Sequence, residues 1–193
     1  MPKTISTMLL LGAMTVAVAA AQKPKQATPD GRLELSFTYD ATLADAITKQ
    51  SFWMQGGSVE LHGQFYKGWG VVADITGLHT GNMHSSGVPL SLVTATFGAR
   101  YTWQQPGRRY ALFGQLLGGE AFGFDSIFPA AGGALENAKS LAAQAGGGMN
   151  IDVSPHLALR AFEADWLRTQ MPNTTTNVQN SIKMGAGVIF RFH

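Results

Sequence analysis

Most of the chain after Asp30 alternates apolar and polar residues with a period of two, and this pattern restricts the fold more than any other feature. Successive side chains of a strand point to opposite faces, so strict alternation predicts strands whose two faces differ in polarity. The clear segments are Arg32–Asp40, Ser58–Tyr66, Trp69–Gly77, Leu92–Gln104, Leu141–Val153 and Ser181–His193. No long helical periodicity interrupts them. We therefore predict an all-β fold.

Two further segments are strand-like but less regular. In Arg109–Phe122 the orientation is ambiguous, because Leu112 and Leu116 predict one outward face and Phe113 and Leu117 predict the other. Both orientations place a bulky apolar residue on each side of the strand. The pattern alone does not choose between them.

The second irregular segment, Leu157–Arg168, fits best with Phe162 and Trp166 pointing outward. This orientation also points Arg160 outward, near a strand end where its guanidinium can reach lipid headgroups. With these two segments the predicted strands number eight.

Short and long connections alternate between the predicted strands. The short ones lie around Lys67-Gly68, Gln105–Arg108 and Ser154–His156, and they contain residues that favour tight turns. The long ones are Ala41–Phe52, Leu78–Pro89, Gly123–Lys139 and Thr169–Val178. Short periplasmic turns and long external loops are typical of an up-and-down barrel in the outer membrane. We predict an eight-stranded antiparallel up-and-down transmembrane β-barrel with both termini on the periplasmic side.

Alternation alone does not tell a membrane barrel from a soluble one, in which the apolar face points inward. Three features favour lipid on the apolar face. The predicted strands have about 10 to 13 residues, enough to cross a bilayer at a tilt. Aromatic residues gather near strand ends, as interfacial girdles do. The polar face carries both signs of charge although only 13% of all residues are charged. A soluble lipocalin-like binding barrel remains an alternative.

The first 21 residues have the pattern of a signal peptide. Lys3 precedes a short apolar run, Met8–Val18, which ends at Ala19-Ala20-Ala21. We expect cleavage after Ala21, a flexible lead-in over residues 22–30, and the barrel domain over residues 31–193. Export to the cell outer membrane follows from this reading.

Several classes of function are excluded or not expected. A formal net charge of +2, without a basic run, argues against nucleic-acid binding. The absence of cysteine excludes disulfides, thiolate metal sites and cysteine nucleophiles. We expect no cofactor and no metal. His79 and His84 lie five residues apart in a Gly-rich stretch, which is more typical of a solvated loop than of a metal site.

The polar face provides the candidate functional residues. We expect an ionic network in the barrel interior, because eight strands enclose a lumen that side chains just fill. Its members are Glu60, Asp74, Arg100, Glu163, Asp165, Lys183 and Arg191. Static ion pairing that fills the barrel is the favoured interpretation. A gated pore of small conductance is the alternative.

The signal peptide, the eight predicted strands and the ending Gly185–Phe192 resemble the bacterial outer-membrane β-barrel family of OmpA-like proteins. The resemblance implies that Phe190 and Phe192 of the last strand are read by the outer-membrane assembly machinery. It implies contact with outer-membrane lipids and lipopolysaccharide, and a monomer. The family's peptidoglycan-binding domain is not expected here. The implied role is structural, with surface interaction through the external loops.

Catalysis is the remaining alternative from another class. Some eight-stranded outer-membrane barrels modify lipid A, and a Ser-His-acid site is conceivable here from residues near the second and third long loops. The candidates are His79, His84, Ser85, Ser86, and Glu120 or Asp125. None is flanked by a catalytic motif, so we do not expect an enzyme.

The third long loop, Gly123–Lys139, is the expected contact surface. It carries Phe124, Ile127 and Phe128. A small hydrophobic cap over the barrel mouth is an equally good interpretation of these three residues.

Overall fold

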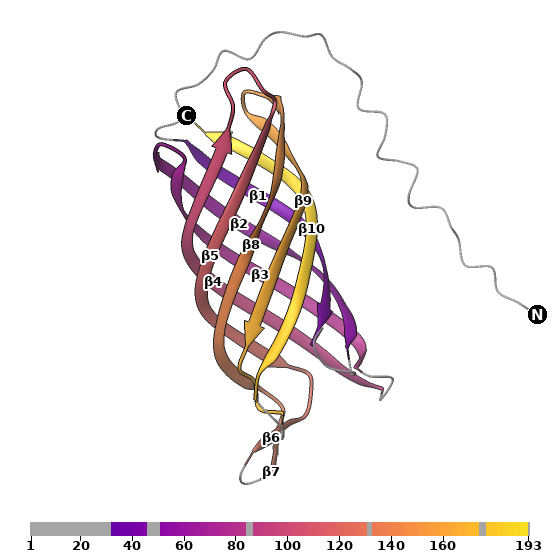
Figure 1. Ribbon diagram of the computed structural model, residues 1–193. Helices are drawn as coiled ribbons and strands as arrows, with labels where there is room; N and C mark the ends of the chain where they lie inside the picture. Colours follow the sequence, from indigo (N-terminus) through magenta and orange to yellow (C-terminus); the bar gives the residue numbers. More distant parts are fainter. Residues whose placement is uncertain (1–31, 46–50, 84–86, 131–132, 174–176, 193) are drawn as a thin grey trace, which may run out of the picture.

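Eight antiparallel strands close into one barrel (Figure 1), in the order β1-β10-β9-β8-β5-β4-β3-β2. The computed structural model describes residues 32–45, 51–83, 87–130, 133–173 and 177–192. The barrel strands are β1 (Leu33–Ala44), β2 (Phe52–Tyr66), β3 (Trp69–Met83), β4 (Val88–Gln104), β5 (Tyr110–Phe124), β8 (Ala138–Ser154), β9 (Leu157–Thr169) and β10 (Gln179–Phe192). The predicted eight-stranded up-and-down barrel is confirmed. The predicted signal peptide and lead-in lie outside the described residues.

The first and last strands close the barrel. β1 pairs with β10 from Leu33 opposite Phe192 to Leu43 opposite Ile182. Every barrel strand therefore has a partner on both sides, and no backbone edge is left for lipid, which offers no hydrogen bonds.

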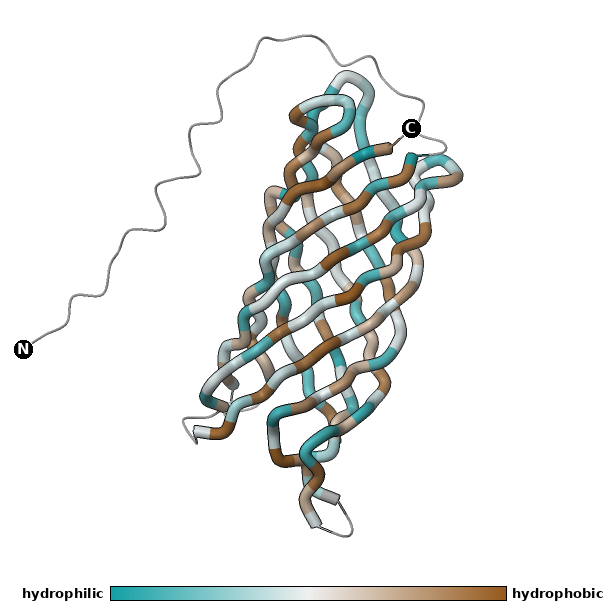
Figure 2. The backbone as a smooth tube through the Cα atoms, turned by 180° about the vertical axis from the view of Figure 1, so that it is seen from behind, coloured by the Kyte–Doolittle hydropathy of each residue, from teal (hydrophilic) through white to brown (hydrophobic). Residues whose placement is uncertain are grey.

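The barrel wall is apolar outside and polar inside. Leu116 is 70% exposed, Leu141 65% and Phe97 61% on the outer face. Figure 2 shows the alternation along each strand as a change from brown to teal. The lumen holds buried Asp, Glu, Arg, Lys, Thr and Gln side chains. A soluble barrel has the opposite polarity, so the lipocalin-like alternative is wrong.

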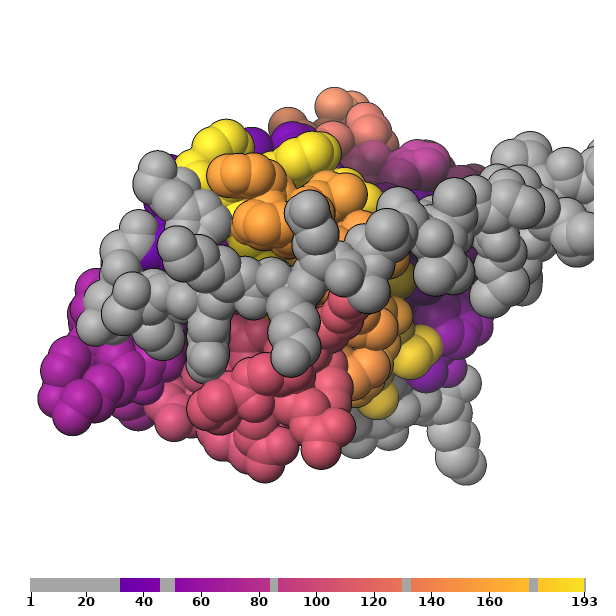
Figure 3. Space-filling model, turned by 90° about the horizontal axis from the view of Figure 1, so that it is seen from above, coloured from indigo at the N-terminus to yellow at the C-terminus, as the bar shows by residue number. Residues whose placement is uncertain are grey.

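The short turns lie at the end that carries the C-terminus (Figure 1) and are viewed end-on in Figure 3. Lys67 and Gly68 have φ values of 40° and 91°, which match the primed two-residue turns that fit the twist of a hairpin. Gly107 has a φ of 76°, and Arg108 N–H donates to the carbonyl of Gln105 at 3.1 Å. These tight turns confirm the prediction and define the end assigned to the periplasm.

A girdle of aromatic residues runs over β2, β3, β4, β5 and β10 near this end. Its exposed members are Phe65, Tyr66, Trp69, Tyr101, Trp103, Tyr110, Phe190 and Phe192. The rings of Trp69 and Tyr101 pack with centroids 5.1 Å apart. Aromatic side chains favour the level of lipid headgroups, so the girdle marks one membrane interface.

The strands are longer than expected at the opposite end, where the long loops were predicted. They run for 12 to 17 residues, more than the roughly 9–11 that cross a bilayer. As a result His79 lies within β3 rather than in a loop. The third loop contains a small hairpin of β6 (Phe128–Ala130) and β7 (Gly133–Leu135), which projects beyond the barrel (Figure 1).

The predicted orientation of Arg160 is wrong. Arg160 is 2% exposed and points into the lumen, whereas Ala161 is exposed. The register shifts at this point, since Met149 pairs with Phe162 and Asn150 pairs with Arg160. Ala161 is therefore the extra residue of a β-bulge, and a bulge reverses the alternation beyond it.

None of the described residues forms a helix that is long and apolar enough to cross a membrane.

Candidate functional site

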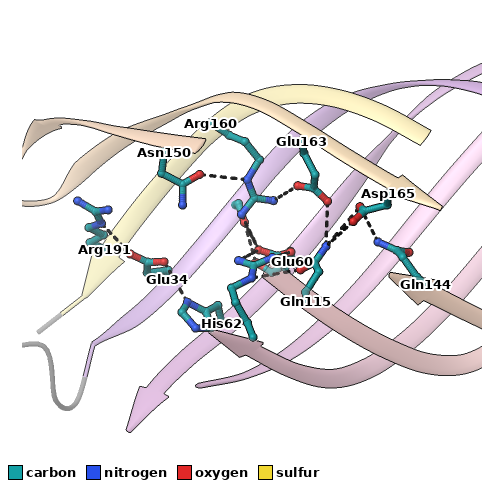
Figure 4. Close-up of polar contacts among 12 residues, drawn as sticks. Glu34, Glu60, His62, Gln115, Gln144, Asn150, Arg160, Glu163, Asp165 and Arg191 are labelled. Atoms are coloured by element: carbon teal, nitrogen blue, oxygen red, sulfur yellow. Dashed lines mark hydrogen bonds and ion pairs between the residues drawn. The ribbon is translucent and has the colours of Figure 1, made fainter. Parts of the chain in front are cut away.

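The centre of the lumen is built around one carboxylate with two guanidinium partners (Figure 4). Glu60 of β2 accepts hydrogen bonds from Arg100 of β4 at 2.7 Å and from Arg160 of β9 at 2.8 Å. Arg160 also donates to Glu163 at 2.5 Å. All four side chains are at most 3% exposed. Two carboxylates and two guanidiniums balance in charge, which is what allows them to lie away from water.

Phe113 of β5 supports both guanidiniums from one side. Its ring centroid lies 4.2 Å from Cζ of Arg100 and 4.9 Å from Cζ of Arg160. A ring face attracts a cation in this arrangement. Phe113 and Leu117 point inward, which resolves the ambiguous orientation of this strand.

Two glutamines extend the network toward the external end. Gln115 accepts a hydrogen bond from Arg100 Nε at 3.1 Å and donates to Glu163 and Asp165, both at 3.2 Å. Gln144 donates to Asp165 at 2.9 Å. The sequence pattern did not predict these amides as site residues. The ambiguous face of β5 hid Gln115, whereas the alternation of β8 already placed Gln144 on the polar face.

Lys183 faces the most acidic part of the lumen. Its Nζ lies 3.7 Å from Glu163 and 3.6 Å from Asp165. Asp40 and Asp74 also act on it electrostatically. Asp74 accepts a hydrogen bond from Thr76 at 2.8 Å. One ammonium therefore serves several buried carboxylates, in contrast to the balanced centre.

A second ionic group lies near the periplasmic end. Arg191 Nε donates to Glu34 at 2.7 Å, and the same guanidinium pairs with Asp152. Nδ1 of His62 lies 3.0 Å from the other oxygen of Glu34. The structure thus places all seven predicted network residues in the lumen but divides them. Arg191 belongs to this group, and the other six lie in the central and external parts.

Apolar side chains close the external end of the lumen. They form a buried cluster of Ala44, Met54, Leu78, Leu92, Ala121, Phe128, Ala142, Leu167 and Met171. Phe128 comes from the third loop, so the cap interpretation holds for this residue. Ile127 beside it is 65% exposed and is available for contact.

The structure brings together two of the predicted catalytic candidates, with a serine that the sequence did not single out. Nδ1 of His79 lies 3.0 Å from Oγ of Ser91, and this Oγ donates to Asp125 at 2.9 Å. In a nucleophilic triad the serine donates to the histidine, and the acid binds the other ring nitrogen. Here the serine lies between the two and donates to the acid. This arrangement fastens the third loop to β3 and β4.

Glu120, the other described candidate, does not join this cluster. Glu120 forms an ion pair with Lys139 at 2.8 Å on the outer wall. His84, Ser85 and Ser86 lie outside the described residues, as does His193. Within the described ranges no group of three or more His, Asp or Glu is arranged to hold a metal ion.

Comparisons with solved structures match the barrel over nearly all of the known chains. The surface protein NspA of Neisseria covers 84% of this chain and 100% of its own, with a TM-score of 0.63 at 14% identity. The fold is that of an eight-stranded outer-membrane β-barrel. Ail of Yersinia pestis (TM-score 0.55, 16% identity, 84% and 99% covered) and OprG of Pseudomonas aeruginosa (0.53, 10%, 87% and 99%) share it. No protein-family model and no curated protein matches the sequence.

The apolar outer wall places this barrel in a lipid bilayer, and closed barrels of this kind are outer-membrane proteins. These proteins resemble the chain in fold. At sequence identities of 10% to 16%, the resemblance concerns the fold and not the activity.

Proposed function

We propose that this chain stabilises the outer membrane and presents an external contact surface, without catalysing a reaction. The observation that carries the proposal is the hairpin of β6 and β7, which projects beyond the barrel (Figure 1). Ile127 is 65% exposed beside it, and Leu135 is 51% exposed within it. Exposed apolar side chains on a projecting loop are typical of a site of protein contact.

The rest of the proposal concerns export and assembly. Residues 1–21 direct export and are removed, and residues 22–30 lead into the barrel. Phe190 and Phe192, on the outer face of β10, are the signal for the assembly machinery. The barrel then acts as a monomer in contact with outer-membrane lipids and lipopolysaccharide. One structure with this fold is Ail in complex with the heparin analogue sucrose octasulfate, which supports testing anionic sugars as ligands.

The experiment compares bacteria that produce the wild-type protein, the Ile127→Ser/Leu135→Ser variant, or neither. Attachment of the cells to surfaces coated with protein or with a sulfated polysaccharide is measured. We expect the wild-type to increase attachment and the variant to lose most of the increase. The heat-dependent gel mobility of both proteins controls for folding. Equal attachment of all three strains would refute the surface role.

A pore of small conductance is the second candidate. Arg100 binds both Glu60 and Gln115, so alternative partners lie within its reach. An exchange of partners could open a path through the centre. Planar-bilayer recordings on wild-type, Arg100→Ala and Lys183→Ala proteins test this, and altered conductance in the variants supports a gated pore. If no variant shows channel events, the pore is excluded and the interior is a static filling.

A further inference from the structure

The outer wall of the barrel carries charge at one place. On the outward faces of the eight strands, within the described residues, the charged side chains are Glu120, Lys139 and Arg168. They lie on β5, β8 and β9, which are neighbours in the barrel. Each lies toward the external end of its strand. The charges therefore form one patch on an otherwise uncharged wall.

Elsewhere on the rim, the described strand residues form no comparable charged patch. β1, β2 and β10 present Tyr39, Leu43, Trp53 and Ile182 outward near their external ends. Tyr39 donates to Gln55 there at 2.9 Å. Any barrel needs a polar level at the interface, but among the described strand residues the outward ionic groups lie on one side alone.

The free-energy cost of a charged side chain that faces lipid depends on its depth in the bilayer. Lys or Arg on the lipid face costs roughly 2–4 kcal/mol at the bilayer midplane and about 0–1 kcal/mol near the interface. Lys139 is the second residue of β8, and Arg168 is the last but one of β9. Both cations therefore lie toward the external interface, and Arg168 lies deeper than Lys139 because it is opposite Ala143.

The two cations differ in the interaction partners that the protein provides for them. Lys139 has a side chain that is 58% exposed, and its ammonium bonds Glu120 and lies 5.2 Å from the ring centroid of Phe122. The guanidinium of Arg168 has no ion pair or hydrogen bond among the described residues. An ammonium has three donors and a guanidinium five, so both retain donors for an external anion.

The two cations are far enough apart to bind two separate anionic groups. Arg168 is opposite Ala143, four residues from Lys139 along β8. Four residues of strand separate the two backbones by roughly 13 Å. Trp166 lies two residues from Arg168 on the same face, where an indole packs well at the interface.

We propose that Lys139 and Arg168 bind the phosphate groups of an outer-leaflet glycolipid of the lipopolysaccharide type. Arg and Lys are the residues that bind phosphate in proteins, through charge-assisted hydrogen bonds. Glu120 holds Lys139 in place and competes with the phosphate for it. The inference rests on the proposed orientation, in which the β6–β7 hairpin lies outside the cell. It adds a lipid ligand on the barrel wall to the proposed contact surface on the loops.

The test uses the folded barrel in detergent micelles, titrated with lipid A that carries both phosphates. The temperature at which the compact gel band disappears is the measure of binding, because a ligand of the folded state stabilises it. Fully dephosphorylated lipid A and inorganic phosphate are the comparison ligands. We expect lipid A with both phosphates to raise the temperature and both comparison ligands to have little effect.

Three variants locate the site. Lys139→Ala/Arg168→Ala should weaken the apparent affinity for lipid A about tenfold, because two charged contacts are lost. Arg108→Ala/Arg109→Ala removes the same charge at the periplasmic turn and should leave the affinity unchanged. Glu120→Gln should bind at least as tightly as the wild-type, since the competing carboxylate is removed.

Equal affinity of the wild-type and the Lys139→Ala/Arg168→Ala variant would overturn the proposal. Equal stabilisation by dephosphorylated lipid A would also overturn it, because acyl chains would then suffice. Stabilisation by inorganic phosphate alone would assign the cations to a soluble anion instead. Loss of binding in the Arg108→Ala/Arg109→Ala variant would contradict the orientation. The attachment assay of Ile127 and Leu135 tests the loop surface separately.

Discussion

At the scale of the residue, the centre of the lumen depends on Arg160. Its guanidinium pairs with both Glu60 and Glu163, and all three side chains are buried. Removing one member of a buried ionic group leaves its partners without compensation, which costs far more than the loss of an exposed pair. Arg160 therefore matters for stability because two buried carboxylates share its guanidinium.

We predict that Arg160→Ala lowers the free energy of unfolding by about 3–5 kcal/mol, since two carboxylates lose a shared partner. Urea unfolding of the barrel in lipid vesicles, followed by tryptophan fluorescence, measures the change. Arg168→Ala on the same strand is the matched control and should change stability by no more than about 0.5 kcal/mol. Similar losses of unfolding free energy in the two variants would show that the buried ion pairs of Arg160 do not stabilise the barrel.

At the scale of the element, the adjacent glycines Gly118 and Gly119 of β5 differ in the space available for a side chain. A Cβ on Gly119 would clash with the carbonyl oxygen of Ala95 and the Cα of Thr96 on β4. A Cβ on Gly118 would meet open space on the outer wall. The close approach of β4 and β5 at Gly119 thus requires a residue without a side chain.

We predict that Gly119→Ala destabilises the barrel by roughly 1–3 kcal/mol, because the two strands must move apart. Gly118→Ala should be close to neutral. The midpoint temperature of the heat-dependent gel shift compares the two variants with the wild-type. A neutral Gly119→Ala would mean that the strands relax without cost at this contact.

At the scale of the whole molecule, closure makes the barrel a single cooperative unit. Each strand is held by two neighbours, and β1 is held by β10 although the two lie at opposite ends of the chain. Opening the ring exposes two strand edges at once, in a solvent that does not satisfy them. The barrel should therefore resist detergent until it is heated.

We predict that the unboiled protein migrates faster than the boiled protein in gel electrophoresis with dodecyl sulfate, because the closed barrel stays compact. A chain truncated before β10 cannot close and should migrate alike in both conditions. An unboiled wild-type protein without a faster band would contradict the closed barrel.

The sequence by itself determined the strand number, the polarity of each regular strand and the end that carries the tight turns. These follow from local properties, since alternation with a period of two and turns that contain Gly or Pro act within a few residues. The sequence also placed seven charged residues on the inner face, because each lies on a strand segment over which the alternation of polar and apolar residues is unbroken. They are Glu60, Asp74, Arg100, Glu163, Asp165, Lys183 and Arg191.

The tertiary structure alone decided where the alternation of polar and apolar residues breaks and which side chains contact each other in the lumen. The bulge at Ala161 turned Arg160 inward, because pairing with β8 and β10 places charge in the lumen rather than in lipid. The same closure chose the inward face of β5 and so brought Phe113 beneath the guanidiniums of Arg100 and Arg160. Such choices depend on neighbours far apart in the chain, and a local pattern holds no information about them.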